Sequence, residues 1–79
     1  MKFVLFEFYD PETDETFYYL IETGEKDREK LREIRDEIQD EYDKIYSDFE
    51  DYEEVYEWLG KKIKEYIPDA RHIDFVFVG

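Results

Sequence analysis

Cysteine is absent from this chain of 79 residues, and histidine occurs once. These absences exclude disulfide bonds, thiolate metal ligands and any metal centre built on a pair of histidines. No apolar run approaches the ~18 residues of a membrane span, and the N-terminus has no signal-peptide pattern. No catalytic motif is present either. The sequence therefore predicts a cytoplasmic protein with no cofactor, no metal site, no catalytic residue and no membrane association.

Basic residues are scarce as well, because 11 Lys and Arg face 24 Asp and Glu and leave a net charge of −13. A protein this acidic is a poor direct ligand for nucleic acid or for an anionic membrane surface, since both repel it. Aromatic residues make up 20% of the chain, which argues against disorder despite the charge. Length and composition together predict a single domain over residues 1–79 with one small core.

Three segments are rich in β-branched and aromatic residues and are predicted to be strands: 2–9, 15–22 and 71–78. The run DPETD between the first two contains a proline and turn-forming aspartates. It predicts a tight turn, so that the first two strands form a hairpin.

The segment between the hairpin and the last strand has two stripes of apolar residues at helical spacing. The first stripe begins at Leu31 and the second ends at Ile67. One helix over both stripes would be ~63 Å long, which is too long for a domain of this size. Ser47 and Glu50 match the S-x-x-E capping box and predict the start of a second helix. The side chains expected to face the sheet are Leu31, Ile34, Ile38, Val55, Leu59 and Ile63.

The order of these elements predicts a two-layer α+β fold of type ββααβ. We expect a three-stranded sheet of order 2-1-3, with the third strand parallel to the first, covered on one face by an antiparallel helical hairpin. The first strand is placed in the centre because the run from Phe3 to Phe6 is entirely apolar, as is typical of a strand covered on both faces. The alternative is the fully antiparallel order 1-2-3.

Two helices can bury only one face of this sheet. The other face is expected to expose an apolar patch of the size that marks an interface. Its residues are Phe3, Leu5, Tyr18, Val76 and Val78. We interpret this face as a surface for homodimer formation or for a partner. The alternative is a partly exposed face without a function.

The charges of the first helix run against the helix macrodipole. Basic residues come early and acidic residues late, which is unfavourable by ~0.3–1 kcal/mol for each terminal charge. Glu29, Glu33, Glu37 and Glu41 form a ladder of like charges, and residues 36–57 carry a net charge of −10. A local rule that is broken without visible compensation indicates a functional surface.

The predicted binding site is the acidic segment 36–57, where the first helix ends and the second begins, together with one aromatic residue that anchors a partner. Carboxylates at regular spacing along a helix can imitate the phosphates of nucleic acid. A basic groove that binds them can release counterions into solution, as it does when it binds phosphates. The predicted binding residues are Asp36, Glu37, Asp40, Glu41, Asp43, Asp48, Glu50, Asp51, Glu53, Glu54, Glu57 and Trp58. The alternative is that the acids only keep the chain in solution and that Trp58 packs against the helices.

Two resemblances accompany these patterns. The segment EKDREKLREIRDEIQDEYDKI and the turn DPETDE resemble computationally designed α/β miniproteins. The acidic profile is similar to that of small inhibitors that mimic nucleic acid, such as anti-CRISPR and anti-restriction proteins. The second resemblance implies a non-enzymatic inhibitor that occupies a basic protein surface, the nucleic-acid-binding groove of an enzyme. The first implies a computationally designed chain, and both resemblances hold together if the chain is a designed inhibitor. The alternative is a designed or thermophile structural domain without a charge-driven partner.

Overall fold

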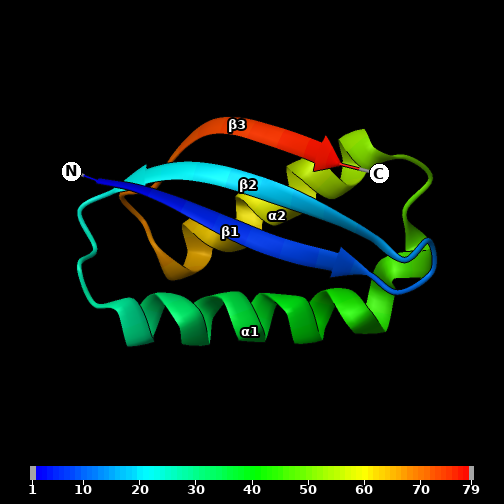
Figure 1. The fold of residues 1–79 in the computed structure, drawn as a ribbon, viewed down its shortest axis with the longest axis horizontal. Coiled ribbons are helices and arrows are strands. Elements are labelled where there is room, and N and C mark those ends of the chain that lie inside the picture. Colours follow the sequence, from blue (N-terminus) through cyan, green and yellow to red (C-terminus); the bar gives the residue numbers. More distant parts are fainter. Residues whose placement is uncertain (1, 79) are drawn as a thin grey trace.

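A computed structural model describes the backbone of residues 2–78 and the side chains of residues 2–71. The chain extends over 33 × 21 × 19 Å along its principal axes. In chain order the elements are β1 (Lys2–Asp10), β2 (Glu15–Thr23), α1 (Arg28–Ile45), the short 3-10 helix η1 (Tyr46–Asp48), α2 (Tyr52–Tyr66) and β3 (Arg71–Val78) (Figure 1).

β1 and β2 form the predicted hairpin. They pair antiparallel without interruption from Lys2 opposite Thr23 to Asp10 opposite Glu15. The turn closes through the Asp14 N–H, which donates to the Asp10 carbonyl at 2.9 Å. Asp14 has a φ of 58°, in the left-handed region that Asp tolerates better than most residues. The Asp10 side chain also accepts from the Glu12 N–H at 2.9 Å, so two aspartates shape this turn, which contains no glycine.

The fold predicted from the sequence is wrong in its sheet. The structure is an α+β arrangement in which β1 and β2 form a two-stranded antiparallel hairpin that packs on two helices. The backbone of β3 runs antiparallel to β2, so the strand order is β1-β2-β3, the alternative order, and β3 does not lie beside β1. The predicted order 2-1-3, with the first strand in the centre, is thereby overturned.

The error came from reading an apolar strand as a central one. In β1 only one face is buried, and Phe3 and Leu5 on the other face are 63% and 57% exposed. The edge of β1 is instead covered in part by polar side chains of α1, because Gln39 and Arg35 bond to its backbone. A helix that lies beside an edge strand can thus satisfy backbone groups that would otherwise call for another strand.

The two helices begin at aspartate caps. The Asp27 side chain accepts hydrogen bonds from the backbone N–H groups of Glu29 and Lys30 and starts α1. At α2 the Asp51 side chain accepts from the Glu54 N–H at 3.0 Å, so this helix starts later than the predicted cap at Ser47. Ser47 lies in η1, within the connection between the helices.

The predicted helical core is confirmed. Every side chain that the two stripes placed against the sheet is buried: Leu31, Ile34, Ile38, Val55, Leu59 and Ile63. From the hairpin they meet Phe6, Phe8, Phe17, Tyr19 and Ile21. In Figure 1, α1 runs along β1 and α2 lies behind β2, so one face of the hairpin is covered.

The opposite face of the hairpin is less covered. Phe3 and Leu5 are exposed as predicted, and Tyr18 is half-buried. The side chains of Val76 and Val78, also predicted for this face, lie outside the described residues. Within the part of the chain that is described, neither helix is long and apolar enough to cross a membrane.

Candidate functional site

One end of the molecule carries most of its net negative charge. In Figure 1 the turn between β1 and β2 lies at the same end of the molecule as the C-terminus of α1 and η1. Residues 10–15 carry a charge of −4, and residues 40–54 carry −7. We call these two segments the acidic end. It holds eleven of the thirteen net negative charges. The sequence predicted the helical part of this surface but not that the turn would join it.

Two tyrosines fasten the turn to the helices. The Tyr42 hydroxyl on α1 donates to Asp10 Oδ2 at 3.1 Å, and the Tyr52 hydroxyl on α2 donates to Glu15 Oε2 at 2.9 Å. Burial, followed by the nearby carboxylate of Asp10, raises the pKa of the Tyr42 hydroxyl. Burial also raises the pKa of Tyr52. Both hydroxyls therefore remain hydrogen-bond donors at neutral pH. A separate hollow of about 290 Å³ lies between the turn and the connection from α1 to α2.

Two of the predicted binding carboxylates cap α2. Asp51 accepts from the Glu54 N–H, and Glu54 Oε1 in turn accepts from the Glu50 N–H at 3.4 Å. Both carboxylates also lie at the N-terminal end of the helix, where negative charge is favourable. Asp51 and Glu54 therefore stabilise the start of α2.

Other predicted carboxylates pair within and between the helices. Asp36 forms an ion pair with Arg35 at 2.7 Å, and Asp43 accepts from Gln39 Nε2 at 2.8 Å. Glu41 forms an ion pair with Lys62 of α2 at 3.0 Å. The Glu41 pair bridges the two helices and compensates part of the reversed charge pattern of α1, which the sequence alone did not reveal.

Glu37 and Glu41 also meet a tyrosine of α2. The Tyr66 hydroxyl donates to Glu41 Oε2 at 3.3 Å. Hydrogen bonding to Glu37, together with burial and the charge of Glu41, raises the pKa of Tyr66 to about 12. These two members of the like-charge ladder therefore serve the contact between the helices.

The remaining predicted carboxylates point to solvent. Within the described part of the chain their side chains have no hydrogen-bond or ion-pair partner, and all of them are exposed: Asp40, Asp48, Glu50, Glu53 and Glu57. These are the members of the predicted site that are available to an external partner.

Trp58 packs inside the helical hairpin. Its ring lies 6.0 Å from the Tyr42 ring and 5.8 Å from the Phe49 ring, measured between centroids. Lys62 Nζ lies 5.8 Å from the centre of the indole ring. Trp58 is only half-buried, but its contacts join α1 to α2 and leave a limited surface for a partner.

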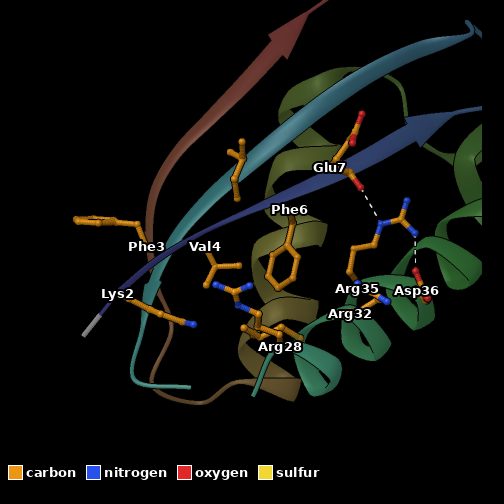
Figure 2. A pocket seen from close by; sticks show the side chains of 11 residues that line it. Lys2, Phe3, Val4, Phe6, Glu7, Arg28, Arg32, Arg35 and Asp36 are labelled. Carbon is orange, nitrogen blue, oxygen red and sulfur yellow. Dashed lines mark hydrogen bonds and ion pairs between the residues drawn. The ribbon is translucent and has the colours of Figure 1, made fainter. Parts of the chain in front are cut away.

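A second charged surface lies beside β1 and was missed from the sequence. It is a groove of about 710 Å³ between β1 and the N-terminal half of α1, with Arg28, Arg32 and Arg35 along its helical side (Figure 2). At 100° per residue these three arginines and Gln39 share one side of α1, next to its apolar stripe. This spacing was visible in the sequence, but the element that it faces was not.

No group of His, Cys, Asp or Glu in the described part of the chain is arranged to hold a metal ion. Comparison with protein-family models, with curated proteins and with solved structures found no match to this chain.

Proposed function

We propose that this protein is a non-enzymatic binding protein whose acidic end occupies the basic nucleic-acid-binding groove of a partner. The observation that supports the proposal is the meeting of two acidic segments, far apart in the sequence, on one end of the molecule. The partner would be a basic protein surface, such as that of a nucleic-acid-binding enzyme. The proposal includes a cytoplasmic location and no direct contact with nucleic acid.

The physical basis is counterion release. A basic groove that binds a phosphate backbone gains free energy when condensed or bound ions are set free, and a dense set of carboxylates can replace the phosphates in the groove. Carboxylates one helical turn apart are ~5–6 Å from each other. The turn adds a second row beside the helical one, so the negative surface is broader than a single helix.

The exposed carboxylates support this function better than the paired ones. Asp40 and Asp48 on the helical part and Glu12 on the turn are exposed and lack side-chain partners among the described residues. The repulsion between these carboxylates destabilises the fold. It is little compensated, because Lys44 is the only basic residue in the acidic end. Clustered repulsive charge of this kind becomes favourable when a cationic partner binds.

The test is displacement of nucleic acid from purified enzymes. A panel of purified DNA- and RNA-binding enzymes is loaded with a fluorescent oligonucleotide, and this protein is titrated in. We expect it to displace the oligonucleotide from at least one enzyme, with an affinity that falls steeply between about 50 and about 200 mM salt.

A pair of matched variants makes the test specific. The triple variant Glu12→Gln, Asp40→Asn, Asp48→Asn should lose most of the displacement. The control triple Glu22→Gln, Glu29→Gln, Glu33→Gln removes the same charge outside the acidic end and should keep it. Equal losses in both triples would mean that only net charge matters. Absence of displacement from every enzyme would favour the alternative, a structural domain without a charge-driven partner.

A further inference from the structure

The outer edge of β1 is half closed and half open. The Tyr9 N–H donates to Gln39 Oε1 at 2.9 Å, and Gln39 Nε2 donates to the Tyr9 carbonyl at 2.9 Å. Both backbone groups of Tyr9 therefore point away from β2. Because the pairing of β1 with β2 is continuous, the backbone groups of successive residues alternate between facing β2 and facing away from it. The N–H and C=O groups of every odd-numbered residue of β1 therefore face away from β2.

The same rule locates the open part of the edge. The carbonyl of Glu7 is taken by Arg35 Nε at 2.9 Å, so α1 serves the edge at Glu7 and Tyr9. By alternation, the N–H and C=O groups of Phe3 and Leu5 also point outward. No other described residue bonds to them. The outward N–H of Glu7 is likewise without a partner among the described residues, so three donors and two acceptors are left in a row on an exposed strand.

This open edge borders the groove beside α1. Val4 and Phe6 line its strand side, and Arg28 and Arg32 line its helical side (Figure 2). Both arginines are exposed and form no ion pair with a described residue. Arg35, in contrast, is held by Asp36 at 2.7 Å. The guanidinium groups nearest the open edge are therefore free to bind an anion.

The groove is positively charged in a strongly negative protein. Four of its lining residues are basic and two are acidic: Lys2, Arg28, Arg32 and Arg35 against Glu7 and Asp36. The acidic end begins at Asp40, eight residues after Arg32 on α1, which is ~12 Å along the helix axis. The Debye length at physiological salt is ~8 Å, so repulsion from the acidic end is partly screened at Arg28 and Arg32.

We propose that the groove binds an extended acidic segment of a partner protein, which adds as a strand to the open edge of β1. The main chain of the segment bonds to the outward groups of Phe3 and Leu5, as in other cases of strand addition. Its carboxylates bind Arg28 and Arg32, since guanidinium and carboxylate match in geometry.

The distance between Arg28 and Arg32 indicates which positions of the bound segment should be acidic. Arg28 and Arg32 are four residues apart on a helix, which is ~6 Å along its axis. Alternate residues of a strand point to the same side and are ~6.6 Å apart. Acidic residues at alternate positions would therefore face both arginines. The residues between them would lie on the outer face beside Phe3 and Leu5, so they are expected to be apolar.

A second copy of this chain does not fit the same edge. Pairing of β1 with the β1 of a copy would be symmetric, and the same surface of both molecules would meet. The arginines of one groove would then face those of the other, which is unfavourable. Since α1 flanks the edge, each copy would also bring its helix into the contact. A single extended strand avoids both conflicts.

The test uses a short synthetic peptide of alternating glutamate and valine with the full-length protein. We expect binding by fluorescence anisotropy, and slower amide hydrogen exchange at Phe3 and Leu5 but not at Val4 and Phe6. The odd–even pattern distinguishes strand addition from general electrostatic attraction. A peptide of alternating lysine and valine is the charge control, and a single-stranded oligonucleotide is the control for another anion.

Two pairs of variants separate the backbone contribution from the charge contribution. Leu5→Pro removes the outward N–H of the open edge, where proline is tolerated, and should weaken binding about tenfold or more. Leu5→Thr keeps the N–H and should change affinity much less. Arg28→Gln with Arg32→Gln should also cost about tenfold or more. The triple variant at the acidic end, used above, should bind the peptide normally, because this proposal does not rest on the proposed function.

Several results would overturn the proposal. They are equal binding of the lysine peptide or of the oligonucleotide, an affinity unchanged by Leu5→Pro in a variant with native circular dichroism, and exchange protection without the odd–even pattern. Dimerisation of the free protein through β1 would assign the edge to a second copy. If the glutamate peptide does not bind at all, the arginines only protect the edge from pairing.

Discussion

The acidic end and the groove beside β1 differ in how many of their charged side chains are paired within the fold. At the acidic end many carboxylates are used within the fold, as caps, as acceptors for tyrosines and in the pair between Glu41 and Lys62. Beside β1, Arg35 has partners, whereas Arg28 and Arg32 have none among the described residues. Charge density alone is therefore a poor guide to function, and what matters is which charges remain unpaired after folding.

The largest effect should come from the core that joins these two regions. Ile38 is fully buried between the helices and the hairpin. We expect Ile38→Ala to lower the free energy of unfolding by ~2–5 kcal/mol, because it removes buried apolar groups and leaves a cavity. Urea unfolding measures this change. A loss below ~0.5 kcal/mol would contradict the packing of α1.

The next effect should come from Gln39, which closes part of the β1 edge. Replacing it with Ala leaves two backbone groups of Tyr9 without their partner and should cost ~1–3 kcal/mol. Arg32→Gln is the matched control on the same side of α1 and should change stability by less than ~0.5 kcal/mol. Equal costs in the two variants would mean that the edge is not divided into a closed and an open half.

A smaller effect of opposite sign should come from the unpaired acids of the acidic end. The triple variant Glu12→Gln, Asp40→Asn, Asp48→Asn relieves like-charge repulsion and should stabilise the protein by ~0.5–1 kcal/mol, a rise in Tm of a few degrees. Differential scanning calorimetry at low salt measures it. The gain should shrink at high salt, and a gain that ignores salt would contradict an electrostatic cause.

The smallest effect should appear as pH dependence at the corner after β2. The Gly24 N–H donates to Asp69 Oδ2 at 2.9 Å and the Thr23 hydroxyl donates to Asp69 Oδ1 at 2.8 Å. These bonds hold the pKa of Asp69 below its usual range. The stabilisation is therefore present above the unfolded pKa, ~3.9, and is lost as pH falls through the folded pKa.

Asp69→Asn isolates this contribution. The variant should be less stable than the parent at neutral pH, and the difference should shrink as the pH falls below about 4. Urea unfolding at a series of pH values provides the comparison. A stability difference that stays constant with pH would show that the Asp69 charge has no part in the corner.

Much of the fold could be predicted because it depends on local patterns. The apolar stripes placed Leu31, Ile38 and Leu59 correctly in the core, and alternation in the first strand correctly exposed Phe3 and Leu5. The cap of α2 was misplaced because S-x-x-E and D-x-x-E patterns follow each other closely there. The structure uses Asp51, whose side chain accepts from the Glu54 N–H.

The candidate surfaces were predicted less well, because they depend on which elements lie side by side. The acids of α1 and α2 were identified from their density, but the contribution of the turn required the contacts of Tyr42 and Tyr52. The groove beside β1 could not be predicted from the order of charges along α1, because that order shows only a mismatch of the arginines with the helix dipole. That Arg28 and Arg32 face a strand edge depends on how α1 packs beside β1.

The charge, the two helices, the hairpin and the buried side of each helix follow from local pattern, since periodicity and capping act over a few residues. The strand order, the meeting of the two acidic segments and the bonds between α1 side chains and β1 depend on contacts between distant segments. Backbone groups at a strand edge can bond either to another strand or to polar side chains. Which of them lies there is settled by packing between distant segments and not by the composition of the strand.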